Sequence, residues 1–255
     1  MTRYFLSDAH LFPEPEEHPG RDRLFSFFDS LCSSVEPGEL WILGDLFDFW
    51  FEYPSVMPAG YGGCICRMRR LTRLGWRVHF LPGNHDCWAG GHFSGSTGAM
   101  VHPDGPVELD AGGVRMLLAH GDGLGRGDIG YRLIRPLLRS RTGAALFRTI
   151  HPTPGTFLAR KFSDTSKRIL RRHMDRIPPG LERWAGERLE DGYDIVMTGH
   201  THLDTVRKLE KGIYVSLGDW LTRFTYCRLE DGSAEPELLS YLTEASKGGN
   251  DERNS

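Results

Sequence analysis

Five short apolar segments of this chain each end abruptly in a small cluster of Gly, Asp, Asn and His residues. Apolar runs of this length, rich in β-branched and aromatic residues and stopped by glycine or another turn-forming residue, are typical of buried β-strands. Each strand would then carry polar side chains at its end. The segments are residues 4–6, 40–43, 78–81, 114–119 and 193–197.

Helical patterns lie between the early strands. Residues 21–34 place Leu24, Phe27, Phe28 and Leu31 on one face, and residues 64–74 do so less clearly. Alternating strands and helices predict an α/β fold with parallel strand pairs. Four later segments (205–209, 213–217, 223–229 and 236–242) follow one another without helices, and we expect them to close a second sheet as antiparallel strands. The expected core is a four-layer αββα sandwich.

A long stretch interrupts this alternation. Residues 123–189 lack a strong strand pattern, contain helical stripes, and are divided by several prolines. We therefore predict a core of residues 1–122 and 190–243 with an inserted helical cap at 123–189. The tail, 244–255, is polar and is expected to be disordered.

Charge is distributed unevenly along the chain. The formal net charge is −3, yet residues 126–188 hold 15 Lys and Arg against 5 Asp and Glu. Such a basic region predicts an anionic partner, namely a phosphate, a nucleic acid or a membrane surface. The alternative is an ordinary set of solvated amphipathic helices, and charge alone does not decide between them.

The sequence also bears on the compartment. The five cysteines are an odd number without the spacing of a disulfide framework, which is typical of reduced thiols in a cytosolic protein. The N-terminus lacks the apolar core of a signal peptide, and no run approaches the 18 apolar residues of a membrane span. We expect a cytoplasmic protein whose membrane contact, if any, is peripheral.

The polar clusters at the strand ends suit divalent metal ions. Carboxylate, amide oxygen and imidazole are all common ligands, and α/β sheets place their sites at strand ends. A single histidine is more often a packed or surface side chain, but five of the eleven histidines fall in these clusters. Seven candidate ligands exceed one tetrahedral site and predict two metals that share a carboxylate. They are Asp8, His10, Asp45, Asn84, His120, His200 and His202.

These motifs, in this order, resemble the five signature blocks of the calcineurin-like metallophosphoesterases. The resemblance implies that Asp8, His10 and His202 hold one metal, that Asn84, His120 and His200 hold the other, and that Asp45 bridges them. It also implies two divalent ions that activate water for attack at phosphorus. His85 would face the phosphoryl group as a general acid or charge stabiliser, and Asp86 would orient it.

Three further features are similar to the UDP-2,3-diacylglucosamine hydrolases of lipid A synthesis. They are the aromatic segment 46–50, the segment 120–132, and the segment 159–167. This resemblance implies hydrolysis at the α-phosphorus to give UMP and 2,3-diacylglucosamine 1-phosphate, with Mn²⁺ as the metal. The best-known members carry Arg where this chain has His85, which is the form usual in the wider superfamily. The residues that would contact the substrate are Trp50, Asp128, Tyr131, Ser163, Ser166 and Lys167.

Other interpretations of the same residues stay open. The chain could be another phosphodiesterase acting on nucleotides or other UDP-linked lipids, or a non-catalytic scaffold on the same fold. Trp50 could simply cover the end of the sheet, and the apolar cap residues could be internal packing. With the lipid hydrolase we expect a UDP-linked acylated sugar as substrate, peripheral contact with the cytoplasmic face of the inner membrane, no nucleic acid, and a monomer.

Overall fold

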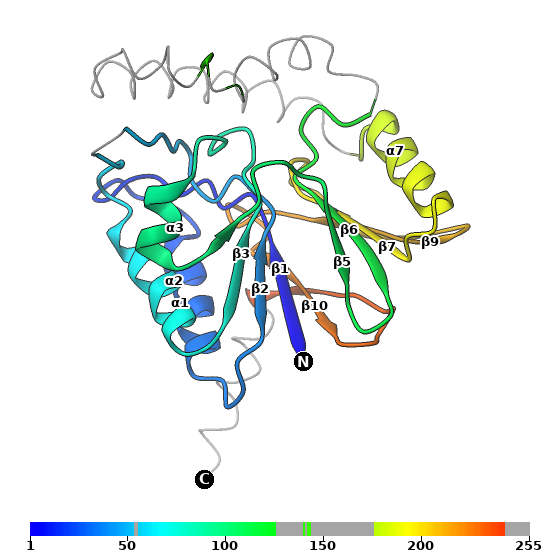
Figure 1. Cartoon of the computed structure of the whole chain (residues 1–255), viewed down its shortest axis with the longest axis horizontal. Helices are drawn as coiled ribbons and strands as arrows, with labels where there is room; N and C mark the ends of the chain where they lie inside the picture. The colour runs from blue at the N-terminus through cyan, green and yellow to red at the C-terminus, as the bar shows by residue number, and fades with distance from the viewer. Residues whose placement is uncertain (54–55, 126–139, 141, 144–175, 243–255) are drawn as a thin grey trace.

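We analysed a computed structural model of the chain, which describes residues 1–53, 56–125, 140, 142–143 and 176–242. Two β-sheets lie face to face, and helices cover the outer face of each (Figure 1). The predicted four-layer αββα sandwich is therefore confirmed.

The first sheet is mainly parallel. Its strand order is β11-β10-β1-β2-β3-β4, in which β1 to β4 run parallel and β10 is antiparallel to both of its neighbours. The carboxyl ends of β1, β2 and β3 therefore meet at one edge of the sheet. The strands are β1 (Thr2–Leu6), β2 (Glu39–Ile42), β3 (Arg77–Phe80), β4 (Met100–Val101), β10 (Thr225–Glu230) and β11 (Glu237–Ser240).

The second sheet has a parallel centre and antiparallel edges. Its order is β5-β6-β7-β9-β8, and the three central strands β6, β7 and β9 are parallel. The ends of β6 and β7 thus also meet at one edge. The strands are β5 (Val107–Asp110), β6 (Arg115–Ala119), β7 (Ile195–Thr198), β8 (Asp204–Leu209) and β9 (Gly212–Leu217).

The prediction that all four C-terminal segments close the second sheet is wrong for two of them. After β9 the chain returns to the first sheet, where β10 pairs with β1 and places Cys227 opposite Phe5. The alternating pattern was correct, but alternation does not specify a partner. Strand β2 pairs with one edge of β1, and β10 pairs with the other edge.

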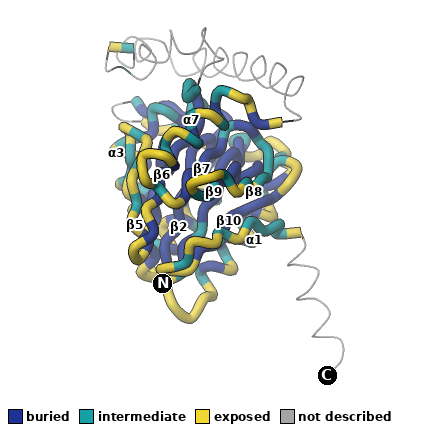
Figure 2. Tube along the Cα trace, turned by 90° about the vertical axis from the view of Figure 1, so that its right-hand side faces the viewer, coloured by how far each residue is buried: buried dark blue, intermediate teal, exposed yellow. Residues whose placement is uncertain are grey.

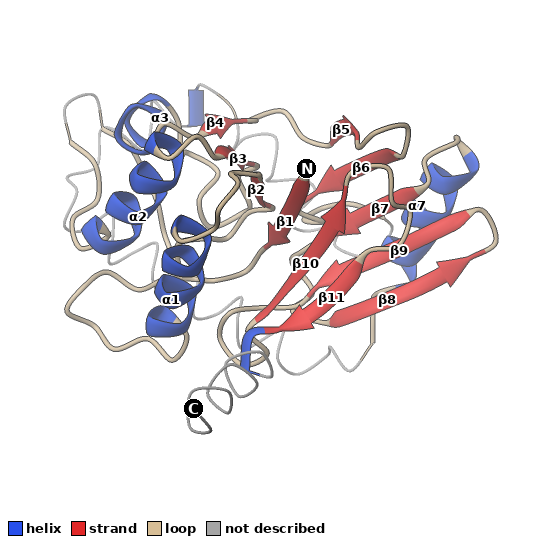
Figure 3. Ribbon diagram, turned by 90° about the horizontal axis from the view of Figure 1, so that it is seen from below, coloured by secondary structure: helices blue, strands red, loops and turns tan. Residues whose placement is uncertain are grey.

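Three helices cover the first sheet, and an aromatic core lies beneath them. They are α1 (Arg21–Cys32), α2 (Gly62–Arg73) and α3 (Gly91–Thr97). In α1 the predicted stripe of Leu24, Phe27, Phe28 and Leu31 is buried against the sheet. Figure 3 shows these helices on one side of the strands and α7 on the other. Figure 2 shows that burial is concentrated along the strands.

Helix α7 (Pro179–Glu190) lies in the range predicted as cap. Its buried residues Leu181, Ala185 and Leu189 pack against Val196 and Tyr214 on the outer face of the second sheet. This helix is therefore the fourth layer of the sandwich, although its sequence lies in the range predicted as cap. Its apolar stripe was recognised, but the surface that it covers depends on the tertiary fold.

Most of the predicted cap and the tail lie outside the described residues, and the division into core and cap stays a prediction. Within the described residues, no helix combines the length and the apolar character that crossing a bilayer requires.

Candidate metal centre

The ends of five strands converge at one edge of the sandwich and bring the seven predicted ligands together. Strands β1, β2 and β3 supply ligands from the first sheet, and β6 and β7 supply them from the second. Backbone hydrogen bonds join the loops directly, since the amide of Asp8 donates to the Gly44 carbonyl and that of His10 donates to the Asp45 carbonyl. The amide of His200 donates to Asp8 Oδ2 at 2.7 Å and so links the two sheets.

Asp8, His10 and His202 form the first group of ligands. The Nε2 atoms of the two histidines are 3.3 Å apart, and each lies 3.7 Å from Asp8 Oδ1. The two imidazole rings are stacked with an interplanar angle of 4°. Three potential ligand atoms therefore surround one point, as the resemblance implies for the first metal.

The second group contains Asp45, Asn84, His120 and His200. Nε2 of His120 lies 3.2 Å from the Asn84 side-chain oxygen and 3.4 Å from Asp45 Oδ2. His200 belongs to the same cluster, in which the ligand atoms of Asp45, His120 and His200 lie within 4.8 Å of one another. Asp45 Oδ2 is also 3.7 Å from His10 Nε2, so a single oxygen atom reaches both groups.

The donor set fits divalent cations. Asp8 Oδ1 is buried and has no hydrogen-bond partner among the described residues, which is costly for a carboxylate oxygen. His120 Nδ1 lies 2.8 Å from the Leu43 carbonyl, a contact that requires the proton on Nδ1. In the neutral ring this leaves a lone pair on Nε2, which faces the oxygen atoms of Asp45 and Asn84. Lone pairs aimed at one another require a cation or a proton between them.

The pKa values reflect the strong local field. Burial by itself would lower the pKa of His120, but the charge and hydrogen bond of Asp45, with Asp8, raise it to about 10. Burial would raise the pKa of Asp45, but His120 and His85 hold it well below its usual value. Burial lowers the pKa of His10 to about 4 despite the neighbouring Asp8.

The backbone of the ligands is strained. Six non-glycine residues in the described part of the chain have positive φ, and five of them are predicted ligands. Such left-handed conformations cost free energy and are found mainly at functional sites. The five are Asp8 (φ 54°), His10 (44°), Asp45 (52°), His200 (66°) and His202 (58°).

Glycine allows the loops to approach one another. A Cβ atom on Gly199 would lie 2.6 Å from both Asp8 Oδ2 and the Ser7 side chain. Only glycine leaves room there for the carboxylate that accepts the His200 amide. The Gly-His pattern at the end of β7 therefore has a steric cause.

His85 lies at the site, but Asp86 does not orient it as predicted. His85 Nδ1 donates to the backbone carbonyl of Asp48 at 2.8 Å, and its Nε2 lies 3.9 Å from Asp45 Oδ2. The buried Asp86 carboxylate instead accepts backbone N–H groups, from Gly83 at 2.7 Å and Leu46 at 2.8 Å. Burial and the nearby Asp45 raise the pKa of Asp86 to about 7. Asp86 thus holds the loops after β2 and β3 together.

The predicted substrate contact Trp50 does not lie among the ligands of the centre. Trp50 is fully buried against Phe47, Tyr61 and Phe93, and its indole N–H donates to Glu52. Trp50 therefore belongs to the buried aromatic core beneath the helices of the first sheet. The other predicted substrate contacts lie outside the described residues; they are Asp128, Tyr131, Ser163, Ser166 and Lys167.

One residue at the centre was missed. The carboxylate of Asp219 lies 3.2 Å from His202 Nδ1 and is buried. Its sequence signal was the same as that of the recognised ligands, because the apolar segment 213–217 also ends in Gly-Asp. We had assigned that segment only to the closing strands.

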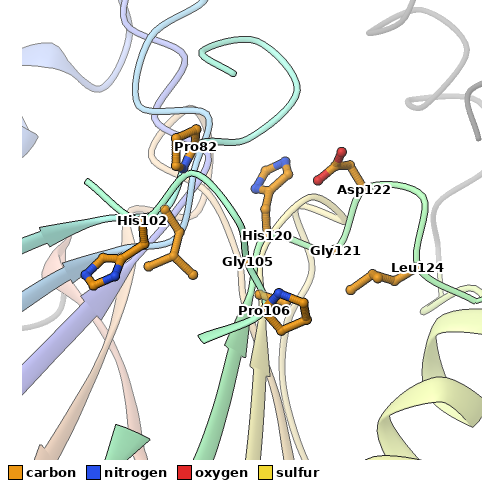
Figure 4. A pocket seen from close by; sticks show the side chains of 10 residues that line it. Pro82, His102, Gly105, Pro106, His120, Gly121, Asp122 and Leu124 are labelled. Carbon is orange, nitrogen blue, oxygen red and sulfur yellow. The ribbon is translucent and has the colours of Figure 1, made fainter. Parts of the chain in front are cut away.

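A small pocket lies beside the second ligand group. Figure 4 shows His120 and Asp122 on one side of it and His102 on the other, with Pro82 and Pro106 between them. Because His120 is a predicted ligand, the pocket adjoins the metal centre. Its lining also includes Leu81, Gly105, Ala119, Gly121 and Leu124.

Several known proteins are similar to this chain. Residues 1–204 match the family described as calcineurin-like phosphoesterase. A UDP-2,3-diacylglucosamine hydrolase of Porphyromonas gingivalis is 32% identical, with 88% of this chain and 92% of that protein covered. Proteins with the same name from Pseudomonas putida (31%, covering 84% and 89%) and Haemophilus influenzae (28%, covering 91% and 96%) are similar. A solved structure of an archaeal phosphodiesterase aligns with a TM-score of 0.45 at 12% identity, covering 94% of this chain and 99% of that one.

The family match spans most of the chain and includes every one of the seven clustered ligands. The resemblance seen in the sequence motifs is therefore confirmed, and the chain belongs to the calcineurin-like phosphoesterases.

Proposed function

We propose that this protein hydrolyses the pyrophosphate of UDP-2,3-diacylglucosamine in lipid A synthesis. Water attacks the α-phosphorus, the bond from that phosphorus to the bridging oxygen breaks, and the products are UMP and 2,3-diacylglucosamine 1-phosphate. The observation that carries this proposal is the pair of ligand groups joined through Asp45, in a chain whose relatives of that name align along most of their length.

The centre would suit a pyrophosphate because two divalent ions held there would concentrate positive charge at a buried edge of the protein. Asp8, His10 and His202 would hold one divalent ion, Asn84, His120 and His200 the other, and Asp45 would contact both. When bound, such ions supply Lewis acidity and lower the pKa of water. We propose Mn²⁺, as the resemblance implies, and the carboxylate and amide oxygens of this set are ligands that suit it.

His85 supplies a proton at a defined atom. The Asp48 carbonyl accepts the Nδ1 proton, so Nε2 points toward Asp45 and the space between the ligand groups. In the protonated ring, Nε2 donates to a phosphoryl oxygen and stabilises the charge that develops there. The imidazole is shorter than the arginine of the best-known relatives, and it reaches the centre from a buried loop.

The basic segment and the location complete the proposal. We propose that residues 126–175 contact the substrate, with Asp128, Tyr131, Ser163 and Lys167 at its sugar phosphate and Ser166 as a further contact. The enzyme would act as a monomer at the cytoplasmic face of the inner membrane, since its substrate is a lipid. The charge of the segment supports this, because Lys and Arg are attracted to anionic lipid surfaces.

The test is hydrolysis of UDP-2,3-diacylglucosamine in ¹⁸O-labelled water with Mn²⁺, beside a generic aryl phosphodiester. We expect turnover of the lipid, with the label in UMP and absent from the sugar phosphate. Label in the sugar phosphate would contradict attack at the α-phosphorus. Turnover of the aryl ester alone would indicate another phosphodiesterase, and no turnover together with no bound metal would favour the scaffold.

A further inference from the structure

Asp219 occupies a position behind the most exposed histidine of the first ligand group. The His202 side chain is 26% exposed, against 2% for His10. Packing therefore restrains the His202 ring less than that of His10. Asp219 Oδ2 lies 3.2 Å from His202 Nδ1, on the side of the ring opposite to Nε2.

Asp219 is itself held firmly by the turn that follows β9. Its Oδ1 accepts the backbone N–H groups of Leu221 at 3.0 Å, Thr222 at 2.7 Å and Arg223 at 3.0 Å. The Thr222 hydroxyl lies 3.1 Å from both carboxylate oxygens. In the same turn the amide of Trp220 donates to the Asp8 carbonyl at 3.1 Å, which fixes the turn to the first ligand group.

This arrangement selects one tautomer of His202. A carboxylate accepts hydrogen bonds, so His202 Nδ1 must carry a proton. In the neutral ring the lone pair is then on Nε2, which faces Asp8 Oδ1 at 3.7 Å and His10 Nε2 at 3.3 Å. The ring is thus ready to bind a metal at Nε2 and is prevented from turning away.

The second ligand group is anchored differently. His120 Nδ1 donates to the backbone carbonyl of Leu43 at 2.8 Å. Among the described residues, the hydrogen bonds of the Asp219 carboxylate reach His202 and the turn 221–223, and none of them reaches a ligand of the second group. A change at Asp219 should therefore affect the two metal positions unequally.

We propose that Asp219 is a positioning residue that selects the tautomer of His202 and thereby sets the metal affinity of the first ligand group. Partners of this kind typically change metal affinity by about 10- to 100-fold when they are removed. The inference uses the two-metal centre of the proposed function but not the identity of the substrate.

The first experiment is Mn²⁺ titration of chelator-treated protein by calorimetry, for the wild type and for Asp219→Asn. The asparagine oxygen can keep the three backbone N–H groups of the turn, which leaves its NH₂ group facing His202 Nδ1. His202 Nδ1 must then accept a hydrogen bond, so the ring proton lies on Nε2 and blocks metal binding at that atom. We expect one of two positions to weaken about 10- to 100-fold and the other to keep its affinity.

A second measurement reads the tautomer without metal. Long-range ¹H–¹⁵N spectra of the metal-free protein should show the His202 proton on Nδ1 in the wild type and on Nε2 in Asp219→Asn. The matched control is Asp194→Asn. The Asp194 carboxylate accepts a hydrogen bond of 2.8 Å from the Arg115 amide, and it is not part of the metal centre. This control should titrate like the wild type.

The outcomes separate the possibilities. Equal weakening of both positions, or no change in either, in a folded Asp219→Asn protein would overturn the proposal. If that variant does not fold, Thr222→Val removes the hydroxyl that contacts the Asp219 carboxylate and keeps the charge of that carboxylate. We then expect a smaller loss of metal affinity at the same single position. An unchanged titration would refute the proposal. Failure of the lipid assay combined with a selective titration would reject the proposed substrate and leave the role of Asp219 in place.

Discussion

Replacing Gly83 by alanine should disturb the carboxylate that joins the two ligand groups. Gly83 follows β3, and a Cβ atom there would lie 2.6 Å from the Asp45 backbone nitrogen and 2.8 Å from Asp45 Cγ, with Oδ1 closer still. Real Cβ atoms do not approach other atoms this closely, and Asp45 is buried. Its carboxylate or the loop must therefore move.

The size of the effect follows from two terms. Forcing an extra methyl group into a well-packed site costs about 1–3 kcal/mol. A displaced Asp45 also loses the His85 amide, which donates to Oδ1 at 2.9 Å, and a hydrogen bond to a charged group contributes about 1.5–3 kcal/mol. We expect Gly83→Ala to lower the free energy of unfolding by about 2.5–6 kcal/mol, the sum of the two terms, and to reduce metal content.

The assay is urea unfolding of the metal-free protein, followed by elemental analysis after reloading. Gly95→Ala is the matched control, because Gly95 lies within α3 and a Cβ atom there meets nothing within 4 Å. Alanine is favoured over glycine inside a helix by about 0.5–1 kcal/mol, so the control should be slightly more stable than the wild type.

The argument would be refuted by a Gly83→Ala protein that unfolds within about 0.5 kcal/mol of the wild type and binds two metals. That result would mean that the loops after β2 and β3 adjust without moving Asp45, contrary to the close packing of protein interiors.

Three further predictions concern single side chains. Asp45→Ala should lose metal from both positions, since one oxygen reaches both groups; two fully occupied positions by elemental analysis would contradict this. His85→Ala should keep its metals and lower kcat by about 10²–10⁴-fold, and near-normal turnover would exclude a catalytic role. Burial and the neighbouring His102 lower the pKa of His79 to about 4 in the folded protein. As the pH falls below about 6.5, His79 is therefore protonated first in the unfolded chain, and the free energy of unfolding decreases until about pH 4. His79→Phe, which keeps a ring against Trp41, should therefore reduce the stability lost between pH 7 and pH 5 by about 1–2 kcal/mol in urea unfolding.

Local pattern was enough to predict helices α1 and α2, the described strands other than β4 and β5, and the chemistry of the site. Apolar runs ending in turn-forming and polar residues identified β1, β2, β3, β6 and β7, and the spacing of Leu24, Phe27 and Leu31 identified α1. These features were visible because they are set by neighbours in the chain, through side-chain periodicity and turn chemistry.

Partners distant in the sequence could not be predicted in the same way. The strand β10 pairs with β1 rather than with the second sheet, α7 forms an outer layer, and Trp50 is inside the core. In each case the residue type was recognised correctly. The surface against which each of them packs is one that no other described segment of the fold covers, and this is known only from the tertiary structure.

The sequence by itself determined which side chains could bind metal, because Asp, Asn and His at strand ends carry the necessary lone pairs. The tertiary structure decided how these side chains are held. In the folded protein His85 donates a hydrogen bond to the Asp48 carbonyl, the Asp86 carboxylate joins two loops, and Asp219 lies behind His202. Ligand chemistry is a property of a residue, whereas orientation depends on hydrogen bonds between segments that only folding brings together.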